Sequence, residues 1–198
     1  MPWIRVIPPE SAEGRLGDIY TRIAGPGGQV DNVLSIHSLR PRTLDAHLSL
    51  YKAAMHSSPC DLSLRERELI GIYVSRLNRC DYCVDHHLAG LGRVLGDPDL
   101  AQRLLSEADR ATGRHLTPRE RAMLAYAKKL TLEPSEMRKT DLAAMRALGM
   151  SDEAILDLNQ VVAYFGYVNR TVLGLGVSVD GEKLGLHPGE DEGELGHR

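Results

Sequence analysis

Two cysteines separated by two residues, Cys80 and Cys83, give the sequence its clearest chemical potential. A helix that begins at Cys80 places the pair in its first turn, where free backbone amides and the positive end of the helix dipole stabilise a thiolate. There a cysteine pKa near 8.5 can fall to roughly 3.5–7.5. The spacing also permits a disulfide across this turn, so the pair predicts redox or metal-binding chemistry.

Side chains that carry protons stand on both sides of the cysteine pair. His86 and His87 lie three and four positions after Cys83, about one helical turn away, and either could exchange a proton with its sulfur. Spacing alone does not choose between them. Glu68 lies on the preceding helix, and a tight connection at residues 78–79 would fold that helix back against the next one. The carboxylate could then orient an imidazole and act as a general base.

These four residues reproduce a known spaced signature. Glu68, Cys80, Cys83 and His87 are separated by eleven, two and three residues, and they resemble the E-x11-C-x2-C-x3-H motif of alkylhydroperoxidase D-like proteins in the carboxymuconolactone decarboxylase superfamily. The flanking residues, Leu77-Asn78-Arg79-Cys80-Asp81-Tyr82-Cys83 and His86-His87, look most like the branch called peroxidase-related proteins. The motif spans 20 residues, and a looser likeness extends from about residue 3 to residue 177.

The resemblance implies an all-α fold, built on a duplicated two-helix unit and assembled as a homo-trimer or homo-hexamer. It implies a thiol-dependent peroxidase or disulfide oxidoreductase that needs no bound cofactor or metal. Cys83 would attack a hydroperoxide and become a sulfenic acid, and Cys80 would resolve it to a disulfide. Glu68 and His87 would move protons. An external dithiol, on a lipoyl-bearing or thioredoxin-like protein, would reduce the disulfide.

Tyr82 departs from the family pattern, because the best-studied members carry a histidine immediately before the second cysteine. A tyrosine donates a hydrogen bond but carries protons poorly at neutral pH, so Tyr82 and His86 are accessory candidates. The decarboxylase members of the superfamily lack the cysteine pair, which disfavours lactone decarboxylation here.

Two other functions use the same residues. A structural zinc site or a redox-sensing module would employ Cys80, Cys83 and His87 without turnover, but zinc needs a fourth ligand and the sequence has no second CxxC and no HxxxH. An inactive relative that serves as an interaction scaffold would keep its helices and have an unreactive cysteine pair.

Other reactive or aromatic residues have simpler interpretations. Cys60 follows Ser-Pro and is expected to be a loop or buried thiol. The aromatic cluster of residues 164–167 is expected in the core or at a subunit interface, with a place in a peroxide pocket as the alternative. Three histidines on the leading helices are expected to be packing residues: His37, His47 and His56.

The pattern of apolar residues is helical nearly throughout. Ser63 with Glu66, and Thr117 with Glu120, form capping boxes that mark two helix starts. Asp97 followed by proline marks a third. The expected helices are 16–23, 32–39, 42–56, 63–77, 80–95, 97–111, 117–132, 138–148 and 151–175.

The two capping boxes also align an internal repeat at an offset of 54 residues. Residues 62–95 and 116–149 share their capping and apolar positions, whereas Glu68, Cys80, Cys83 and His87 have no chemical counterpart in the second copy. One duplicated unit would then provide the scaffold and the other the chemistry, within a single domain of residues 1–179. Chance similarity between helix caps is the alternative.

Composition narrows the remaining possibilities. The 198 residues carry 24 Lys and Arg against 27 Asp and Glu, a net charge of −3, which gives no support for a nucleic-acid partner or an anionic membrane. Three cysteines are too few for a disulfide scaffold and fit a cytoplasmic protein. We expect no membrane span, because polar residues interrupt the longest apolar stretch, 155–177. The acidic, glycine-rich tail, residues 180–198, lacks an apolar face, so we expect it to be disordered and without function.

Overall fold

The computed structural model describes residues 2–25, 27–110 and 112–185, and every regular element in these ranges is helical. The α-helices are α1 Gly14–Ile23, α2 Asn32–Ser35, α3 Pro41–Met55, α4 Leu64–Leu77, α5 Asp81–Leu95, α6 Pro98–Arg110, α7 Pro118–Leu132, α8 Ala143–Ala147 and α9 Asp152–Leu175. Three short 3₁₀ helices are η1 Pro9–Ser11, η2 Pro134–Glu136 and η3 Lys139–Leu142. The prediction of an all-α fold is confirmed for these ranges.

Both predicted capping boxes form and fix the starts of α4 and α7. Ser63 Oγ accepts from the backbone N–H of Glu66 at 3.2 Å, and the Glu66 carboxylate accepts from the backbone N–H of Ser63 at 2.8 Å. Thr117 and Glu120 repeat this arrangement at 3.1 and 2.7 Å. The free amides at both helix starts are therefore satisfied by side chains that the sequence identifies.

Two helices differ from the sequence prediction. The α-helix expected over residues 32–39 ends at Ser35. The chain then continues in tighter turns, in which His37 N–H donates to the carbonyl of Leu34 at 3.0 Å and Ser38 N–H donates to that of Ser35 at 2.9 Å. The helix expected over residues 138–148 begins as the 3₁₀ turn η3 and becomes α-helical only at Ala143. Turns of this kind are common at helix starts.

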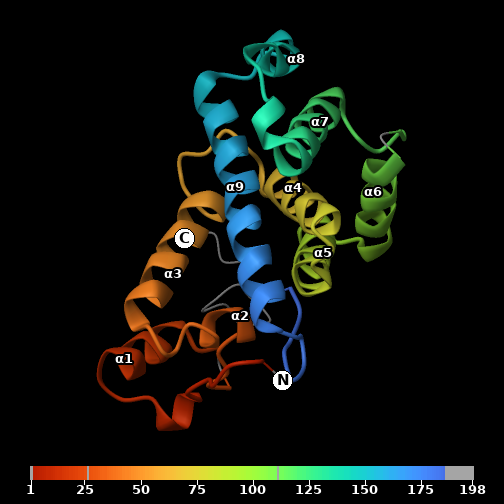
Figure 1. Cartoon of the computed structure of the whole chain (residues 1–198). Helices are drawn as coiled ribbons and strands as arrows, with labels where there is room; N and C mark the ends of the chain where they lie inside the picture. Colours follow the sequence, from red (N-terminus) through yellow and green to blue (C-terminus); the bar gives the residue numbers. More distant parts are fainter. Residues whose placement is uncertain (1, 26, 111, 186–198) are drawn as a thin grey trace.

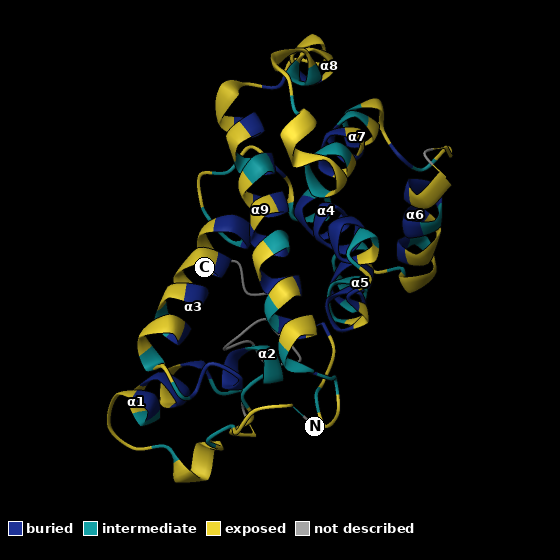
Figure 2. Ribbon diagram, viewed as in Figure 1, coloured by how far each residue is buried: buried dark blue, intermediate teal, exposed yellow. Residues whose placement is uncertain are grey.

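Helix α4 lies at the centre of the fold (Figures 1 and 2). All nine residues from 67 to 75 are buried, because α4 packs against α5, α7 and α9. Gly71 lets α9 approach closely, since a Cβ atom at this position would lie 2.3 Å from the ring of Phe165. The chemistry-bearing turn between α4 and α5 is thus attached to the most buried helix of the described chain.

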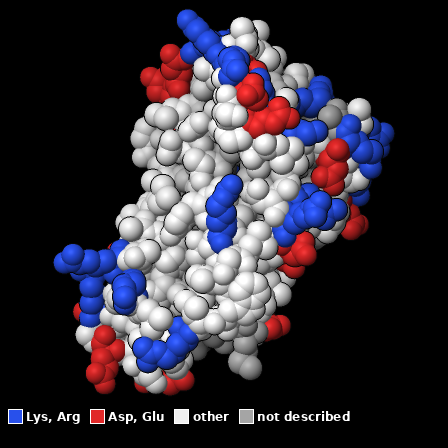
Figure 3. Space-filling view, viewed as in Figure 1, with Lys and Arg blue, Asp and Glu red and all other residues white. Residues whose placement is uncertain are grey.

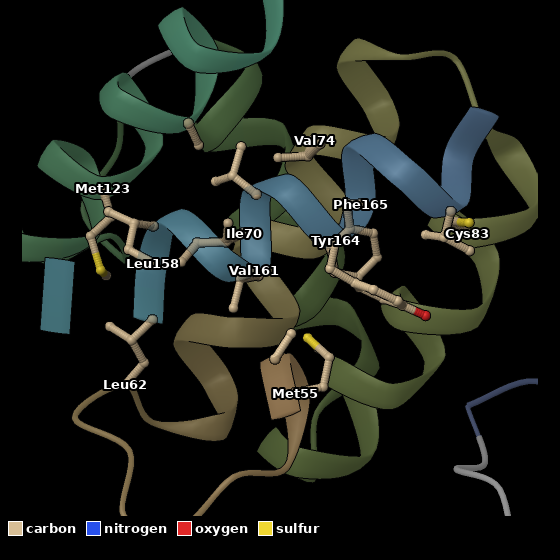
Figure 4. Close-up of a cluster of buried hydrophobic side chains, with 14 of the residues drawn as sticks. Met55, Leu62, Ile70, Val74, Cys83, Met123, Leu158, Val161, Tyr164 and Phe165 are labelled. Atoms are coloured by element: carbon tan, nitrogen blue, oxygen red, sulfur yellow. The ribbon is translucent and has the colours of Figure 1, made fainter. Parts of the chain in front are cut away.

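The long helix α9 separates two groups of helices (Figure 1). It packs against α3 on one side and against α4 and α7 on the other. Figure 4 shows the apolar side chains between these helices, including Leu158, Val161 and Phe165 from α9. Cys83 and the hydroxyl group of Tyr164 lie at the same end of this cluster.

Charged side chains are unevenly distributed on the face seen in Figure 3. They gather toward the ends of the molecule and along its α6–α7 side, whereas the middle of the face is mostly uncharged. Within the described ranges, no helix combines the length and the hydrophobicity that crossing a membrane would need.

Candidate active site

The turn between α4 and α5 positions the cysteine pair. The N–H of Cys80 donates to the carbonyl of Ser75 at 2.9 Å, and the N–H of Arg79 donates to the carbonyl of Arg76 at 3.1 Å. These two bonds form a Schellman motif, whose left-handed residue is Arg79 with φ 58°. The motif ends α4 and places Cys80 directly at the N-cap of α5. The predicted tight connection at residues 78–79 is therefore confirmed.

Both sulfurs of the motif are buried and hydrogen-bonded to each other. Cys80 is 0% exposed and Cys83 is 3% exposed. The hydrogen bonds donated by the Cys83 thiol, the Cys83 amide and Asn169 lower the pKa of the Cys80 thiol. The pKa of Cys83 is raised well above its usual value, because it shares its proton with Cys80 and is buried. The pair thus favours one thiolate at a time, with the charge first on Cys80.

A buried polar group on α9 and α4 supports the two sulfurs. Asn169 is fully buried, and its side chain donates to Ser75 Oγ at 3.0 Å and accepts from Asn78 at 2.9 Å. Hydrogen bonds from Asn169 favour the thiolate forms of both Cys80 and Cys83. Sequence reasoning did not assign these residues to the site. The available signal was Asn169 itself, a polar residue within the apolar stretch of α9.

Glu68 and His87 meet beside the cysteine pair. The N–H at Nδ1 of His87 donates to Oε2 of Glu68 at 2.8 Å, and the Glu68 side chain is fully buried. The ring of His87 packs edge-to-face on Phe165, with centroids 4.8 Å apart. Since Nδ1 is held by the carboxylate, Nε2 is the ring nitrogen left to exchange a proton. The expectation that the folded-back α4 returns Glu68 to the site is confirmed.

A pocket opens onto Cys83. It brings together Cys83, His86 and His87 from α5 with residues of α2, α3, α9 and the chain after α9. Its described lining is Asp31, Val33, Leu34, His47, Tyr51, Tyr82, Cys83, His86, His87, Tyr164, Val168 and Gly185. Cys80 is fully buried and is not among these residues. Of the two cysteines, Cys83 is therefore the one that a small molecule in the pocket would approach.

Tyr82 and His86 bind a carboxylate that the sequence did not suggest. Glu182 Oε1 accepts from the Tyr82 hydroxyl at 3.0 Å, and Glu182 Oε2 accepts from His86 Nε2 at 3.1 Å. Burial and the charges of Glu182 and Asp31 raise the pKa of Tyr82 well above its usual value. Tyr82 is thus a fixed hydrogen-bond donor, in agreement with the expectation that it carries protons poorly.

The position of Glu182 corrects the expectation for the tail. Residues 180–185 were expected to be disordered and without function, but the Glu182 side chain is only 5% exposed and Gly185 lines the pocket. The composition suggested an unpacked segment because residues 180–185 have no apolar face. In the structure these residues are held by hydrogen bonds rather than by apolar packing. The rest of the predicted tail, residues 186–198, lies outside the described residues.

Asp31 brings a carboxyl group to the lining of the pocket, in addition to the carboxyl groups that bind His86 and His87. Burial, followed by the nearby Glu182 carboxylate, raises its pKa to about 6, while the charge of His86 acts in the opposite direction. Two carboxyl groups close together ionise less readily than one, and in this pair the pKa of Asp31 is the one that rises. No feature near residue 31 in the sequence pointed to a place beside Cys83.

The histidines of the leading helices pack as predicted. His47 Nδ1 hydrogen-bonds His37 Nε2 at 3.4 Å, and His47 Nε2 bonds the Tyr164 hydroxyl at 3.2 Å. Burial lowers the pKa of His37, and lowers that of His47 to about 3, so both rings are neutral at pH 7. His56 hydrogen-bonds Tyr51 at 3.0 Å. All three are hydrogen-bonded within the fold, and His47 also lines the pocket.

The aromatic cluster divides between its two predicted places. Phe165 is fully buried, Tyr164 is buried and lines the pocket, and Tyr167 is 37% exposed. Cys60 lies in the loop between α3 and α4, and partial burial raises its pKa. It is thus a loop thiol, as predicted.

The zinc interpretation finds no ligand set in the described part of the chain. No group of three or more His, Cys, Asp or Glu side chains in residues 2–25, 27–110 and 112–185 is arranged to hold a metal ion. A structural zinc site requires four such ligands. The cysteine pair is instead surrounded by hydrogen-bond donors and a carboxylate–histidine pair.

Comparisons with known proteins identify the family of this chain. The Carboxymuconolactone decarboxylase family profile matches residues 41–129, which include α4 and α5. A peroxidase-related protein from Silicibacter sp. TM1040 is 32% identical, with a TM-score of 0.69 over 76% of this chain and 77% of that one. The alkylhydroperoxidase AhpD core of a peroxidase-related protein from Ralstonia eutropha JMP134 is 28% identical, with a TM-score of 0.73 over 89% and 91% of the two chains.

A curated relative is also similar over most of its length. The protein YdfG of Bacillus subtilis (strain 168) is 26% identical over 148 residues, which cover 72% of this chain and 93% of YdfG. The identity to the Silicibacter protein, the matched profile and the shared helical fold lead to one assignment. This chain belongs to the carboxymuconolactone decarboxylase family, in its alkylhydroperoxidase D-like group.

Proposed function

We propose that this protein is a thiol-dependent peroxidase that reduces hydroperoxides with its Cys80–Cys83 dithiol. One observation carries the proposal: Cys83 lines a pocket together with His87, whose other ring nitrogen is held by the buried carboxylate of Glu68. A reactive thiol needs a base and a partner thiol to resolve it, and His87 in the shared pocket and Cys80 are the candidates for these two roles. The similarity to peroxidase-related proteins also supports a peroxidase reaction.

The first step is loss of one proton from the dithiol. His87 takes that proton at Nε2, because its Nδ1–H is bound by Glu68. The remaining proton is shared between the sulfurs. At rest this proton is mainly on Cys83. When the proton moves to Cys80, Cys83, which lines the pocket, becomes the thiolate. Access, rather than resting pKa, thus assigns the attack to Cys83.

The following steps consume one hydroperoxide. The Cys83 thiolate attacks the distal oxygen, so that an S–O bond forms, the O–O bond breaks, and an alkoxide leaves and takes up a proton in the pocket. The Cys80 sulfur then attacks the Cys83 sulfenic acid, and the departing hydroxide combines with the Cys80 proton as water. Dithiol and hydroperoxide thus become disulfide, alcohol and water.

Two partners complete the proposed cycle. An external dithiol, on a lipoyl-bearing or thioredoxin-like protein, returns two electrons to the Cys80–Cys83 disulfide by thiol–disulfide exchange. We also propose that the chain assembles as a homo-trimer or homo-hexamer, which sedimentation of the purified protein measures directly.

Replacing each cysteine tests the proposal. We expect Cys83→Ser to lower turnover of tert-butyl hydroperoxide with a dithiol reductant by at least about a thousandfold, because the attacking sulfur is lost. Cys80→Ser should still form one sulfenic acid at Cys83, which trapping with dimedone and mass spectrometry detect, but no disulfide. Cys60→Ser is the matched control and should keep full turnover.

Two results would contradict the assignment. Full peroxide consumption by Cys83→Ser would exclude the thiol mechanism. A dimedone adduct on Cys80 in the Cys83→Ser variant, with turnover retained, would reverse the roles of the two cysteines.

A further inference from the structure

A second carboxylate–histidine pair faces the pocket, in addition to Glu68 and His87. It consists of Glu182, from the segment after α9, and His86, whose Nε2 lies 3.1 Å from the carboxylate. The side chains are 5% and 11% exposed, so the pair is largely shielded from water. His86 lines the pocket with Cys83. The steps proposed above use only the first pair.

Hydrogen bonds fix the segment that carries Glu182, and its residue Gly185 lines the pocket. The side-chain amide of Asn32 donates to the carbonyls of Ser178 at 2.9 Å and Asp180 at 3.2 Å. Arg93 donates to the carbonyl of Gly185 at 3.1 Å. Gly185 lies so close to α5 that a Cβ atom there would be 2.9 Å from Ala89. These contacts hold residues 178–185 in one place against α2 and α5.

The hydrogen bonds of Glu182 determine which nitrogen of His86 carries protons. Oε1 accepts from the Tyr82 hydroxyl and from the backbone N–H of Asn32. Oε2 accepts from the N–H at Nε2 of His86. With Nε2–H held in this way, Nδ1 is the nitrogen left to gain and lose a proton.

We propose that His86 is the acid that protonates the leaving oxygen of the hydroperoxide, and that Glu182 is its positioning residue. This inference rests on the proposed peroxidase function. As Cys83 attacks and the O–O bond breaks, the proton on His86 passes to the alkoxide, which leaves as the alcohol. His86 becomes neutral and regains a proton from solvent or from the protonated His87, so the proton balance closes over one cycle.

The two pairs thus divide the proton chemistry around one sulfur. Glu68–His87 removes a proton from the dithiol, and Glu182–His86 supplies one to the product. The groups that face His86 are Glu182 from the C-terminal segment, Asp31 from the start of α2, and Tyr82 on its own helix. Glu182 accepts a hydrogen bond from His86 Nε2, and the Tyr82 hydroxyl fixes Glu182.

The test compares two peroxides that differ in their need for an acid. Single-turnover oxidation of the reduced full chain is followed by quenching with an alkylating reagent and mass spectrometry. tert-Butyl hydroperoxide releases a strongly basic alkoxide, whereas peracetic acid releases acetate, which needs no proton. His86→Gln should slow oxidation by tert-butyl hydroperoxide about a hundredfold and oxidation by peracetic acid less than about threefold.

Glu182→Gln tests the positioning role. The amide oxygen must take the Oε1 place, which accepts two donors, so the amide N–H₂ faces His86 and forces Nε2 to become an acceptor. The neutral ring then carries its one proton at Nδ1, and no group accepts a proton from Nε2, so the ring cannot hold the second proton that makes it an acid. Oxidation by tert-butyl hydroperoxide should fall about tenfold or more, with peracetic acid little affected. Asp180→Asn, on the same segment but exposed, should leave both rates unchanged.

The outcomes separate this inference from the proposed function. Equal losses with both peroxides, or no loss with either, would overturn the role of His86, and a selective loss in His86→Gln without one in Glu182→Gln would overturn that of Glu182. If Glu182→Gln does not fold, as circular dichroism would report, His86→Gln and Glu182→Ala decide the same question. Peroxide consumption that survives Cys83→Ser contradicts the proposed function itself, whatever the leaving group.

Discussion

Asp31 is a carboxyl group whose surroundings favour its protonated form. Burial and the charge of Glu182 raise its pKa from 3.8 to about 6. Below pH about 4 the folded and unfolded chains both bind this proton, and between about 4 and 6 only the folded chain keeps it. The contribution of Asp31 to stability is therefore present at low pH and lost as the pH rises through 6.

Asp31→Asn removes this titration. The free energy of unfolding of the variant, minus that of the wild type, should increase between pH 4 and pH 7 by at most about 3 kcal/mol, since one pKa unit corresponds to about 1.4 kcal/mol. Urea unfolding at several pH values measures the difference. A difference that stays constant or decreases over this range would contradict the prediction.

Asp45 provides a control of opposite sign. Hydrogen bonds from Arg15 and Arg22 lower its pKa, so ionised Asp45 stabilises the folded chain and loses that effect as the pH falls through its pKa. Urea unfolding of the wild type and of Asp45→Asn measures this effect. The free energy of unfolding of the wild type, minus that of the variant, should increase as the pH rises from about 2 to 4.

At the scale of elements, the turn between α4 and α5 decides where the cysteines stand. Its left-handed residue is an arginine, although glycine adopts φ near 58° without a steric penalty. Arg79→Gly should raise the free energy of unfolding by about 0.5–1 kcal/mol, because the strain at the exposed residue 79 is removed. Denaturant unfolding measures this gain.

An arginine inside a helix is the matched control for this substitution. Arg103 lies in α6 with its side chain half exposed. Arg103→Gly should lower the free energy of unfolding by about 1 kcal/mol, the usual cost of glycine within a helix. Destabilisation of similar size by both substitutions would show that the left-handed turn stores no strain.

At the scale of the whole molecule, the two capping boxes are joined by a reciprocal set of ion pairs. Arg65 Nε donates to Glu120 at 2.7 Å, and Arg119 Nε donates to Glu66 at 2.9 Å. Each arginine also donates to a carbonyl before the other box, that of His115 at 3.0 Å or Asp61 at 2.9 Å. All of these positions correspond at the predicted offset of 54 residues. The arrangement is what two copies related by a local two-fold axis would produce, and the duplication stays a prediction.

The two halves of this arrangement differ in burial, so each is a control for the other. The Glu120 side chain is 3% exposed, and that of Glu66 is 13% exposed. Arg65→Ala should lower the free energy of unfolding by about 2–3 kcal/mol, because a buried carboxylate loses its partner, and Arg119→Ala by about 1 kcal/mol. Urea unfolding compares them, and an equal or larger loss in Arg119→Ala would contradict the ranking.

The sequence by itself determined the features that depend on near neighbours. The capping residues marked the starts of α4 and α7, and the spacing of Glu68, Cys80, Cys83 and His87 indicated the family. These signals are readable because helix starts and one-turn spacings involve residues three or four positions apart. The short turn allowed Glu68 to return toward the cysteine pair, but the sequence alone did not force this pairing.

Only the tertiary structure decided how the site is completed. It paired His86 and His87 with different carboxylates, a choice that spacing left open. It turned Cys83 rather than Cys80 toward the pocket, and it brought Asn169 and Glu182 to the motif across 86 to 102 residues of chain. Such contacts arise from the packing of α9 on α4 and from hydrogen bonds that hold residues 178–185. They have no periodicity in the sequence, because a single polar side chain that meets a distant partner leaves no repeating pattern.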